Sequence, residues 1–207
     1  MFRISYLKFK FNDWKHEHRA RKKRKKKGFA DCDCWGMNSW LSETFSKMVL
    51  TLRDMKHGAP ELPFEEIETF PIEWLEPEIE KLKLVREKEE REDFDLYSIF
   101  DRWYLVLTRI AYCLQQADEW LIEIDNEYSE EYHNQVWGKD KDLTEHFVPI
   151  EYDNKGKPKL YKLVTNEPEK DLEKKYWDRE KEIMNYRISM KDEAFDLIKK
   201  YFYNLWD

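Results

Sequence analysis

One long apolar pattern constrains the fold of this chain more than any other feature. Between residues 93 and 124, apolar side chains recur at steps of three and four residues, which is the spacing of one face of an α-helix. The members of this series are Phe94, Tyr97, Phe100, Trp103, Leu107, Ile110, Leu114, Ala117, Leu121 and Ile124. We therefore expect a long amphipathic helix over 93–124 that forms the spine of the core.

Helical patterns also dominate the first part of the chain. Good helix formers over residues 12–27 predict a basic helix that Gly28 ends as its C-terminal cap. Residues 2–11 fit either a short strand or the start of that helix. A second helix is expected to begin near Asn38 or Ser39, because both residue types are natural N-caps and apolar residues then follow at helical spacing.

The segment over residues 59–92 is rich in proline and in acidic residues. Prolines that precede acidic, helix-favouring stretches suit the first turn of a helix. The sequence therefore predicts a short helix around 71–76, or a kinked helix that continues to about residue 90.

Two further elements are expected near the end of the chain. The runs FVPIEY and KLYKLVT flank the turn signal DNKGKP, which predicts a small β-hairpin over 146–165. Ser189 and Asp192 have the spacing of a capping box, so a last helix over 189–206 is expected to begin there. Because Leu205 and Trp206 lie at its end, we expect this helix to dock its C-terminus in the core.

Composition and length place the chain among compact helical proteins. A length of 207 residues fits one domain, and an aromatic content of 16% argues against disorder. Five glycines make a Gly-rich phosphate loop unlikely, and no apolar run is long enough to span a membrane or to act as a secretory signal. Three cysteines make a poor disulfide framework. We predict a mainly α domain over 1–207, with about six helices and one small hairpin, in a cytoplasmic compartment.

Charge is distributed very unevenly behind the net value of −7. Residues 8–27 form a basic arm with eleven Lys or Arg against two acids, whereas residues 61–95 carry fourteen acids against five bases. The arm can lie on the acidic part of the chain, or it can present a separate cationic surface to an anion.

The stretch KKKGFADCDCWGMNSW raises the question of a metal site. Cys32, Cys34 and His57, with His16 and His18 upstream, have the chemistry of zinc ligands. The spacing argues against a metal, because zinc knuckles favour two to four residues between ligands and Cys32 and Cys34 are one residue apart. The alternative is a structural joint in which Asp31 and Asp33 pair with nearby Lys or Arg.

The basic run over 19–27 is a candidate for nucleic-acid binding. It contains eight Lys or Arg in nine residues, and such a run binds phosphates by releasing counterions, without reading the base sequence. A metal- or Cys-dependent enzyme is a weaker alternative, since Cys34 has no local catalytic signature.

Two other binding modes are open. The acidic stretch over 61–95 can imitate a phosphate backbone and occupy a basic groove of another protein. Aromatic side chains together with Lys or Arg can also line a pocket for an anionic ligand such as a nucleotide.

The string KKGFADCDCWGMNSWL, the later HGAP and the C-terminal AFDLIKKYFYNLWD resemble a group of small phage-encoded proteins without an assigned biochemical activity. The resemblance covers about the first 60 and the last 15 residues, and Asn38 stands where that pattern has Asp. Its matching positions are Lys27, Gly28, Phe29, Asp31, Asp33, Trp35, Gly58, Pro60 and Trp206. The resemblance implies a phage setting, in an infected bacterial host, and it disfavours a metal site because the two cysteines are not part of the pattern.

The resulting prediction is a non-catalytic phage accessory protein that binds a host factor. Its most plausible targets are a host defence or nucleic-acid enzyme, or the nucleotide signal of such an enzyme; the alternative is nucleic-acid binding through 19–27. No cofactor, no catalytic residue and no membrane contact are predicted. The residues nominated for ligand or partner binding are Arg19, Arg21, Lys22, Arg24, Asp31, Asp33, Trp35 and His57.

Overall fold

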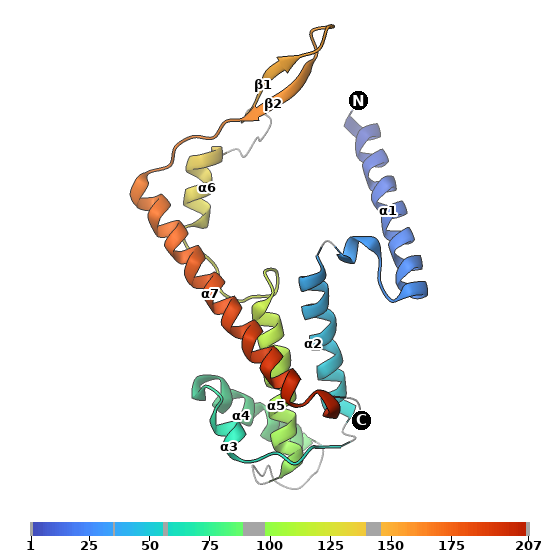
Figure 1. The fold of residues 1–207 in the computed structure, drawn as a ribbon, viewed down its shortest axis with the longest axis vertical. Helices are drawn as coiled ribbons and strands as arrows, with labels where there is room; N and C mark the ends of the chain where they lie inside the picture. The colour runs from blue at the N-terminus through green and yellow to red at the C-terminus, as the bar shows by residue number, and fades with distance from the viewer. Residues whose placement is uncertain (1, 35, 56–57, 89–97, 140–145, 206–207) are drawn as a thin grey trace. The chain divides into compact units, whose positions relative to one another are not determined.

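A computed structural model describes residues 2–34, 36–55, 58–88, 98–139 and 146–205 (Figure 1). These residues group into two compact units. The first unit consists of Met1–Leu121 and Met190–Asp207, and the second of Ile122–Ser189. The sequence predicts one domain over 1–207, and this division into two compact units does not test that prediction.

The described residues confirm a mainly α fold with one small hairpin. The elements in chain order are α1 (Phe2–Lys27), the 3₁₀ helix η1 (Asp31–Cys34), α2 (Met37–Met55), α3 (Glu65–Glu68), α4 (Ile72–Lys88), α5 (Ile99–Ala117), α6 (Ser129–Trp137), β1 (Phe147–Tyr152), β2 (Pro158–Leu163), α7 (Lys170–Lys200) and the 3₁₀ helix η3 (Phe202–Asn204). The strands β1 and β2 pair antiparallel, as expected for the hairpin over 146–165.

The core of the first unit is built around α5. Consecutive residues of this helix are buried, including Leu105, Val106 and Leu107, so α5 is covered on nearly its whole circumference. The covering side chains come from α2, α3, α4 and the C-terminal part of α7. The main ones are Val49, Ile67, Leu82, Ala194, Leu197 and Ile198. The prediction that this apolar pattern forms the spine of the core is therefore confirmed for α5.

The predicted extent of that helix is wrong at its C-terminal end. α5 ends at Ala117, and Asp118 has an extended backbone. The Asp118 carboxylate accepts a hydrogen bond of 2.8 Å from the backbone N–H of Trp120, which is a local bond that competes with helix continuation. Leu121 and Ile124 fit the apolar spacing but lie beyond the helix, and residues 93–97 lie outside the described part of the chain.

Two predicted helix starts are also wrong. α2 begins at Met37, so Asn38 and Ser39 lie inside the helix. α7 begins at Lys170 and runs through Ser189, whose hydroxyl donates a 2.7 Å bond to the carbonyl of Tyr186 one turn back. A Ser or Asp inside a helix is tolerated when its side chain bonds to the preceding turn or faces water, so these residue types alone do not set a boundary.

Other predicted features are confirmed. Residues 2–11 form the start of the basic helix rather than a strand. Gly28 ends that helix with a positive φ of 82°, and its N–H donates to the carbonyl of Arg24 at 2.8 Å. α4 follows the longer of the two alternatives, since it continues past Pro77 to Lys88. At the C-terminus, Tyr201 is buried and Leu205 packs against the core, whereas Trp206 lies outside the described residues.

The second unit has its own aromatic cluster. The rings of Tyr132 in α6 and Tyr176 in α7 stack with centroids 4.0 Å apart, and Trp177 packs edge-on against Tyr176. Asn126 donates from its side-chain amide to the carbonyl of Tyr176 and to Glu180. These contacts join α6 to the N-terminal half of α7.

Candidate nucleic-acid interface

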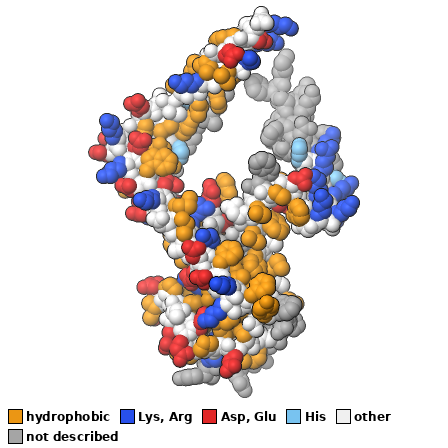
Figure 2. Space-filling model, viewed as in Figure 1, with side chains coloured by type: hydrophobic (Ala, Val, Ile, Leu, Met, Phe, Trp, Pro, Cys, Tyr) orange, Lys and Arg blue, Asp and Glu red, His pale blue; other side chains and the backbone are white. Residues whose placement is uncertain are grey.

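The basic run of α1 is exposed along its whole length. All eight Lys and Arg between residues 19 and 27 are exposed, and they form the cationic cluster on α1 in Figure 2. Helix geometry places Arg19, Lys22 and Lys26 on one face, because they are spaced by three and four residues. At about 1.5 Å per residue this face carries three cations over roughly 10 Å.

A pair of aspartates holds the C-terminal end of this helix. Arg24 donates two bonds to the Asp33 carboxylate, at 3.0 Å from Nε to Oδ2 and 2.5 Å from Nη2 to Oδ1. The N–H of Ala30 donates a third bond to Asp33, at 2.7 Å. Asp31 forms an ion pair with Lys23. The prediction that Asp31 and Asp33 pair with nearby Lys or Arg is therefore confirmed.

These contacts of Asp31 and Asp33 with Lys23, Arg24 and Ala30, called the clamp below, keep Asp33 ionised. The hydrogen bonds from Arg24, followed by the bond from Ala30, lower the pKa of Asp33 to about 2, since they stabilise the ionised form. The ion pair with Lys23 also lowers the pKa of Asp31. At 3.6 residues per turn, Arg24 lies on the side of α1 opposite Arg19, Lys22 and Lys26. The clamp thus orients the helix without occupying that cationic face.

Most of the positive charge of the run stays available to a ligand. Arg21 pairs with Glu17 at 2.5 Å, and Lys23 and Arg24 are held by η1. Among the described residues the remaining five cations have no ion-pair partner. They are Arg19, Lys22, Lys25, Lys26 and Lys27.

The acidic segment over 59–92 does not neutralise this run within the described part of the chain. Among the described residues, every ion-pair partner of residues 19–27 lies within ten residues of its cation, in α1 itself or in η1. Glu66 in the acidic segment instead pairs with Lys200 of α7. Of the two arrangements that the charge distribution allows, the described contacts therefore favour a separate cationic surface.

The cysteines between the two aspartates are exposed. Cys32 lies 3.9 Å from Nη2 of Arg24 and 3.7 Å from Oδ1 of Asp33, and Cys34 lies 3.9 Å from the carbonyl of Ala30. Among the described side chains, no group of three or more His, Cys, Asp or Glu is placed to hold a metal ion. The nominated residues Trp35 and His57 lie outside the described residues.

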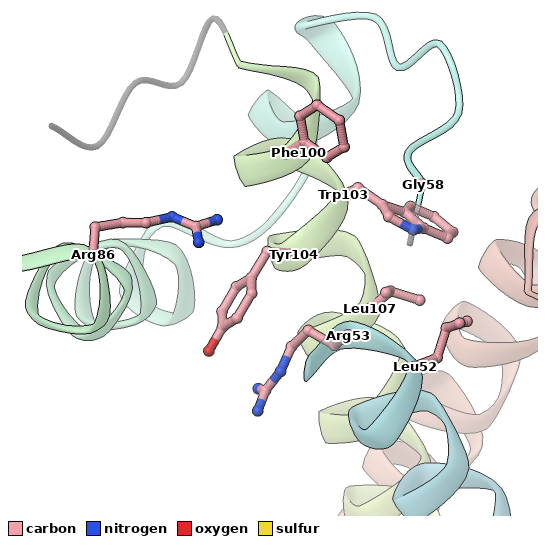
Figure 3. Close-up of a pocket in the computed structure, with 8 residues that line it drawn as sticks. All are labelled: Leu52, Arg53, Gly58, Arg86, Phe100, Trp103, Tyr104 and Leu107. Carbon is pink, nitrogen blue, oxygen red and sulfur yellow. The ribbon is translucent and has the colours of Figure 1, made fainter. Parts of the chain in front are cut away.

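The first unit also contains a pocket of about 210 Å³ between α2, α4 and α5 (Figure 3). Aromatic, aliphatic and arginine side chains line it together with a glycine. The lining residues are Leu52, Arg53, Gly58, Arg86, Phe100, Trp103, Tyr104 and Leu107.

Both arginines of this pocket already contact carboxylates. Arg86 donates to Oδ1 of Asp101 from Nε at 2.9 Å and from Nη2 at 2.5 Å, and both residues are buried. Arg53 donates to Asp54 at 2.8 Å, and its guanidinium lies 4.6 Å from the centre of the Tyr104 ring. Burial is the main reason that the pKa of Tyr104 is raised, so its hydroxyl is neutral. The pocket therefore offers aromatic contact with little uncompensated charge.

Sequence reasoning missed the buried arginines Arg86 of α4 and Arg109 of α5. Arg109 interrupts a helix that is otherwise mostly apolar and buried. A charged residue inside such a pattern is a usable signal, since Arg is rarely buried unless it is paired. The identity of the partners, Asp101 and Glu193, depends on contacts that span 15 and 84 residues.

Comparisons of the chain with protein-family models, with curated proteins and with solved structures found no match. None of the described helices is both long enough and apolar enough to cross a lipid bilayer.

Proposed function

We propose that this chain is a non-catalytic binding protein whose α1 takes the phosphate backbone of nucleic acid. The observation that carries the proposal is the exposed run over 19–27, in which five cations have no ion-pair partner among the described residues. Lys and Arg side chains on one helix contact phosphates without reading bases, so the proposed binding is independent of sequence.

The clamp at η1 supports this proposal. Asp33 holds Arg24 by two bonds, and Arg24 lies on the far side of α1 from Arg19, Lys22 and Lys26. A helix that is oriented before binding loses less conformational freedom on binding than a free basic tail. Asp31 and Asp33 are therefore positioning residues for the interface in this proposal.

The pocket in the first unit supports a nucleotide ligand less well. Its volume of about 210 Å³ lies below the ~300–1,000 Å³ of pockets that enclose drug-sized ligands. Its two arginines also already face Asp54 and Asp101. The role of a phage accessory protein that targets a host enzyme or its nucleotide signal stays a prediction. Nucleic-acid binding through residues 19–27 is the alternative to that role.

The test is the salt dependence of DNA binding, measured by fluorescence anisotropy with labelled duplexes of several sequences. If all five free cations contact phosphate, the slope of log K against log salt is about −4.5. Affinity then falls about 500-fold between ~50 and ~200 mM salt, equally for every sequence. No binding at the lowest salt would refute the proposal.

A matched pair of variants separates this surface from general charge. Replacing Lys22, Lys25 and Lys26 by Gln should reduce the slope by about 3, since each lost phosphate contact removes close to one unit. Replacing three exposed lysines of α7, namely Lys174, Lys175 and Lys181, makes the same change in net charge. Equal losses of affinity in the two variants would contradict the assignment to α1.

A further inference from the structure

The pocket between α2, α4 and α5 has walls that are held by residues outside it. The ring of Trp103 packs edge-on against Tyr201 of the C-terminal segment, with ring centroids 5.4 Å apart. On another wall, Arg86 is held by its two hydrogen bonds to the buried Asp101. These contacts do not depend on a ligand. The pocket is therefore preformed, and a preformed pocket binds a ligand without the cost of ordering its walls.

The apolar part of the pocket is mostly aromatic. α5 contributes three aromatic side chains, Phe100, Trp103 and Tyr104. Trp103 lies together with Leu52 and Leu107 on one side of the pocket in Figure 3. Phe100 is 53% exposed, so one aromatic ring of the lining is open to solvent rather than covered by the core. Such walls favour a planar aromatic ligand, because aromatic rings pack well against one another when offset or edge-on.

Arg53 places an unused hydrogen-bond donor at this pocket. Its Nε donates to Asp54 at 2.8 Å and its Nη1 to Thr108 at 3.3 Å, and the guanidinium lies 4.6 Å from the centre of the Tyr104 ring. Among the described residues, Nη2 of Arg53 has no hydrogen-bond partner. The Arg53 side chain is only 19% exposed, which limits competition from water for this donor. The pocket therefore favours a ligand that carries an acceptor oxygen.

The charges around the pocket do not favour an anion. The charged groups that act most strongly on the Tyr104 hydroxyl belong to three ion pairs of the described residues. The pairs are Arg53 with Asp54, Arg86 with Asp101, and Lys81 with Glu78. Each cation is thus matched by an acid, so a negative charge on the ligand gains little. A neutral acceptor, such as a carbonyl oxygen, meets the free donor without adding a charge.

The volume limits the size of the ligand. The pocket measures about 210 Å³. An apolar cavity of about 150 Å³ takes one benzene molecule. The additional space fits a small substituent on one ring, and it does not fit a base together with a sugar and a phosphate.

We propose that this pocket binds a small neutral aromatic molecule that carries a carbonyl oxygen. The ring packs against Phe100 and Trp103, and the oxygen accepts a hydrogen bond from Nη2 of Arg53. This site lies outside α1 and takes a ligand of a different class from the phosphates assigned to α1, so it goes beyond the proposed function.

Benzamide is a direct probe, because it joins one ring to one neutral carbonyl group. Its titration into the ¹⁵N-labelled full chain, followed by NMR, should shift the indole N–H signal of Trp103 with a Kd on the order of 1 mM. Benzoate has the same shape with a negative charge, and toluene lacks the oxygen. Both should bind at least about fivefold more weakly. No shift of the Trp103 signal at ~20 mM benzamide, or equal or tighter binding of benzoate or toluene, would overturn the proposal.

Two exposed phenylalanines of the first unit provide a matched pair of variants. Phe100 lines the pocket and is 53% exposed, whereas Phe195 of α7 is 45% exposed and is not part of the lining. Phe100→Ala should weaken benzamide binding about fivefold or more, since the ligand loses an aromatic wall. Phe195→Ala should leave it unchanged. Equal effects of the two substitutions would contradict binding in this pocket.

Arg53→Met tests the hydrogen bond separately from the packing. Methionine keeps an apolar stem beside Tyr104 but has no N–H to donate. In this variant benzamide should lose its preference over toluene, while toluene binding stays within about twofold. A preference that survives in Arg53→Met would refute the assigned donor. None of these measurements involves α1, so their outcome is independent of nucleic-acid binding.

Discussion

Replacing Glu193 by Ala should destabilise the first unit strongly, because this carboxylate is the partner of a buried arginine. Glu193 of α7 accepts two bonds from Arg109 of α5, from Nε at 2.6 Å and from Nη2 at 2.7 Å. The Arg109 side chain is only 2% exposed, whereas that of Glu193 is 30% exposed. Truncation of the acid therefore leaves the guanidinium buried without its carboxylate.

The arginine keeps its charge after this substitution. Burial lowers the pKa of Arg109, but the hydrogen bonds that Arg109 donates to Glu193 and nearby charges outweigh it, and the pKa is raised overall. Even without Glu193 the guanidinium stays protonated, because its ordinary pKa lies far above neutral pH.

The magnitude follows from the burial of the two partners. Removing one member of a fully buried ion pair costs about 3–5 kcal/mol. Glu193 is partly hydrated, which places the cost near the lower end, and the rings of Trp74 and Tyr112, at 4.8 and 5.4 Å from the guanidinium, offset part of it. We expect a loss of about 2–3 kcal/mol in the free energy of unfolding.

Urea denaturation followed by circular dichroism measures this loss, and hydrogen exchange of α5 amides assigns it to the first unit. Asp192→Ala is the matched control: this neighbouring acid is 61% exposed and pairs with Lys191, so its loss should cost at most about 0.5 kcal/mol. The double variant Arg109→Met with Glu193→Leu should recover much of the stability. If Glu193→Ala and Asp192→Ala had equal effects, the Arg109 ion pair would not hold α7 to α5 as argued.

Three further predictions concern titratable groups of the first unit. Replacing Asp31 and Asp33 by Ala should lower the melting temperature more than replacing Cys32 and Cys34 by Ala, and the opposite order would revive a metal site. Because the pKa of Asp33 falls from its ordinary value near 3.9 to about 2, its contribution to stability is complete above about pH 4 and disappears as the pH falls through 2. Acid unfolding of Asp33→Asn should therefore show a weaker pH dependence in that window. Burial raises the pKa of Cys113 to about 12, so a thiol reagent at neutral pH should modify two of the three cysteines quickly and Cys113 only after unfolding.

Local spacing predicted the elements whose boundaries are set by local chemistry. The apolar pattern around Leu107 and Leu114 identified the central helix, because a residue at every third or fourth position defines one face whatever the rest of the chain does. The hairpin was predicted from two β-rich runs around a turn signal. The end of α1 at Gly28 was predicted because a helix end favours a residue that can adopt a positive φ.

Boundaries that depend on competing interactions were not predictable in this way. The apolar spacing continues through Leu121, yet α5 ends when the Asp118 side chain bonds to the next backbone N–H instead. Ser189 has the sequence of a helix start, yet α7 passes through it. Each outcome is decided by small differences between local bonds and packing, which spacing alone does not measure.

For the candidate interface, the sequence by itself determined the density of positive charge in 19–27 and the position of two aspartates within reach of it. The tertiary structure decided that Arg24 pairs with Asp33 and that five cations of the run have no ion pair among the described residues. It also decided that Glu66 of the acidic segment pairs with Lys200 rather than with the basic run. Charge is a property of single residues and can be counted along a chain. Pairing requires two side chains to meet at about 3 Å, and the fold alone brings together residues as far apart as Glu66 and Lys200.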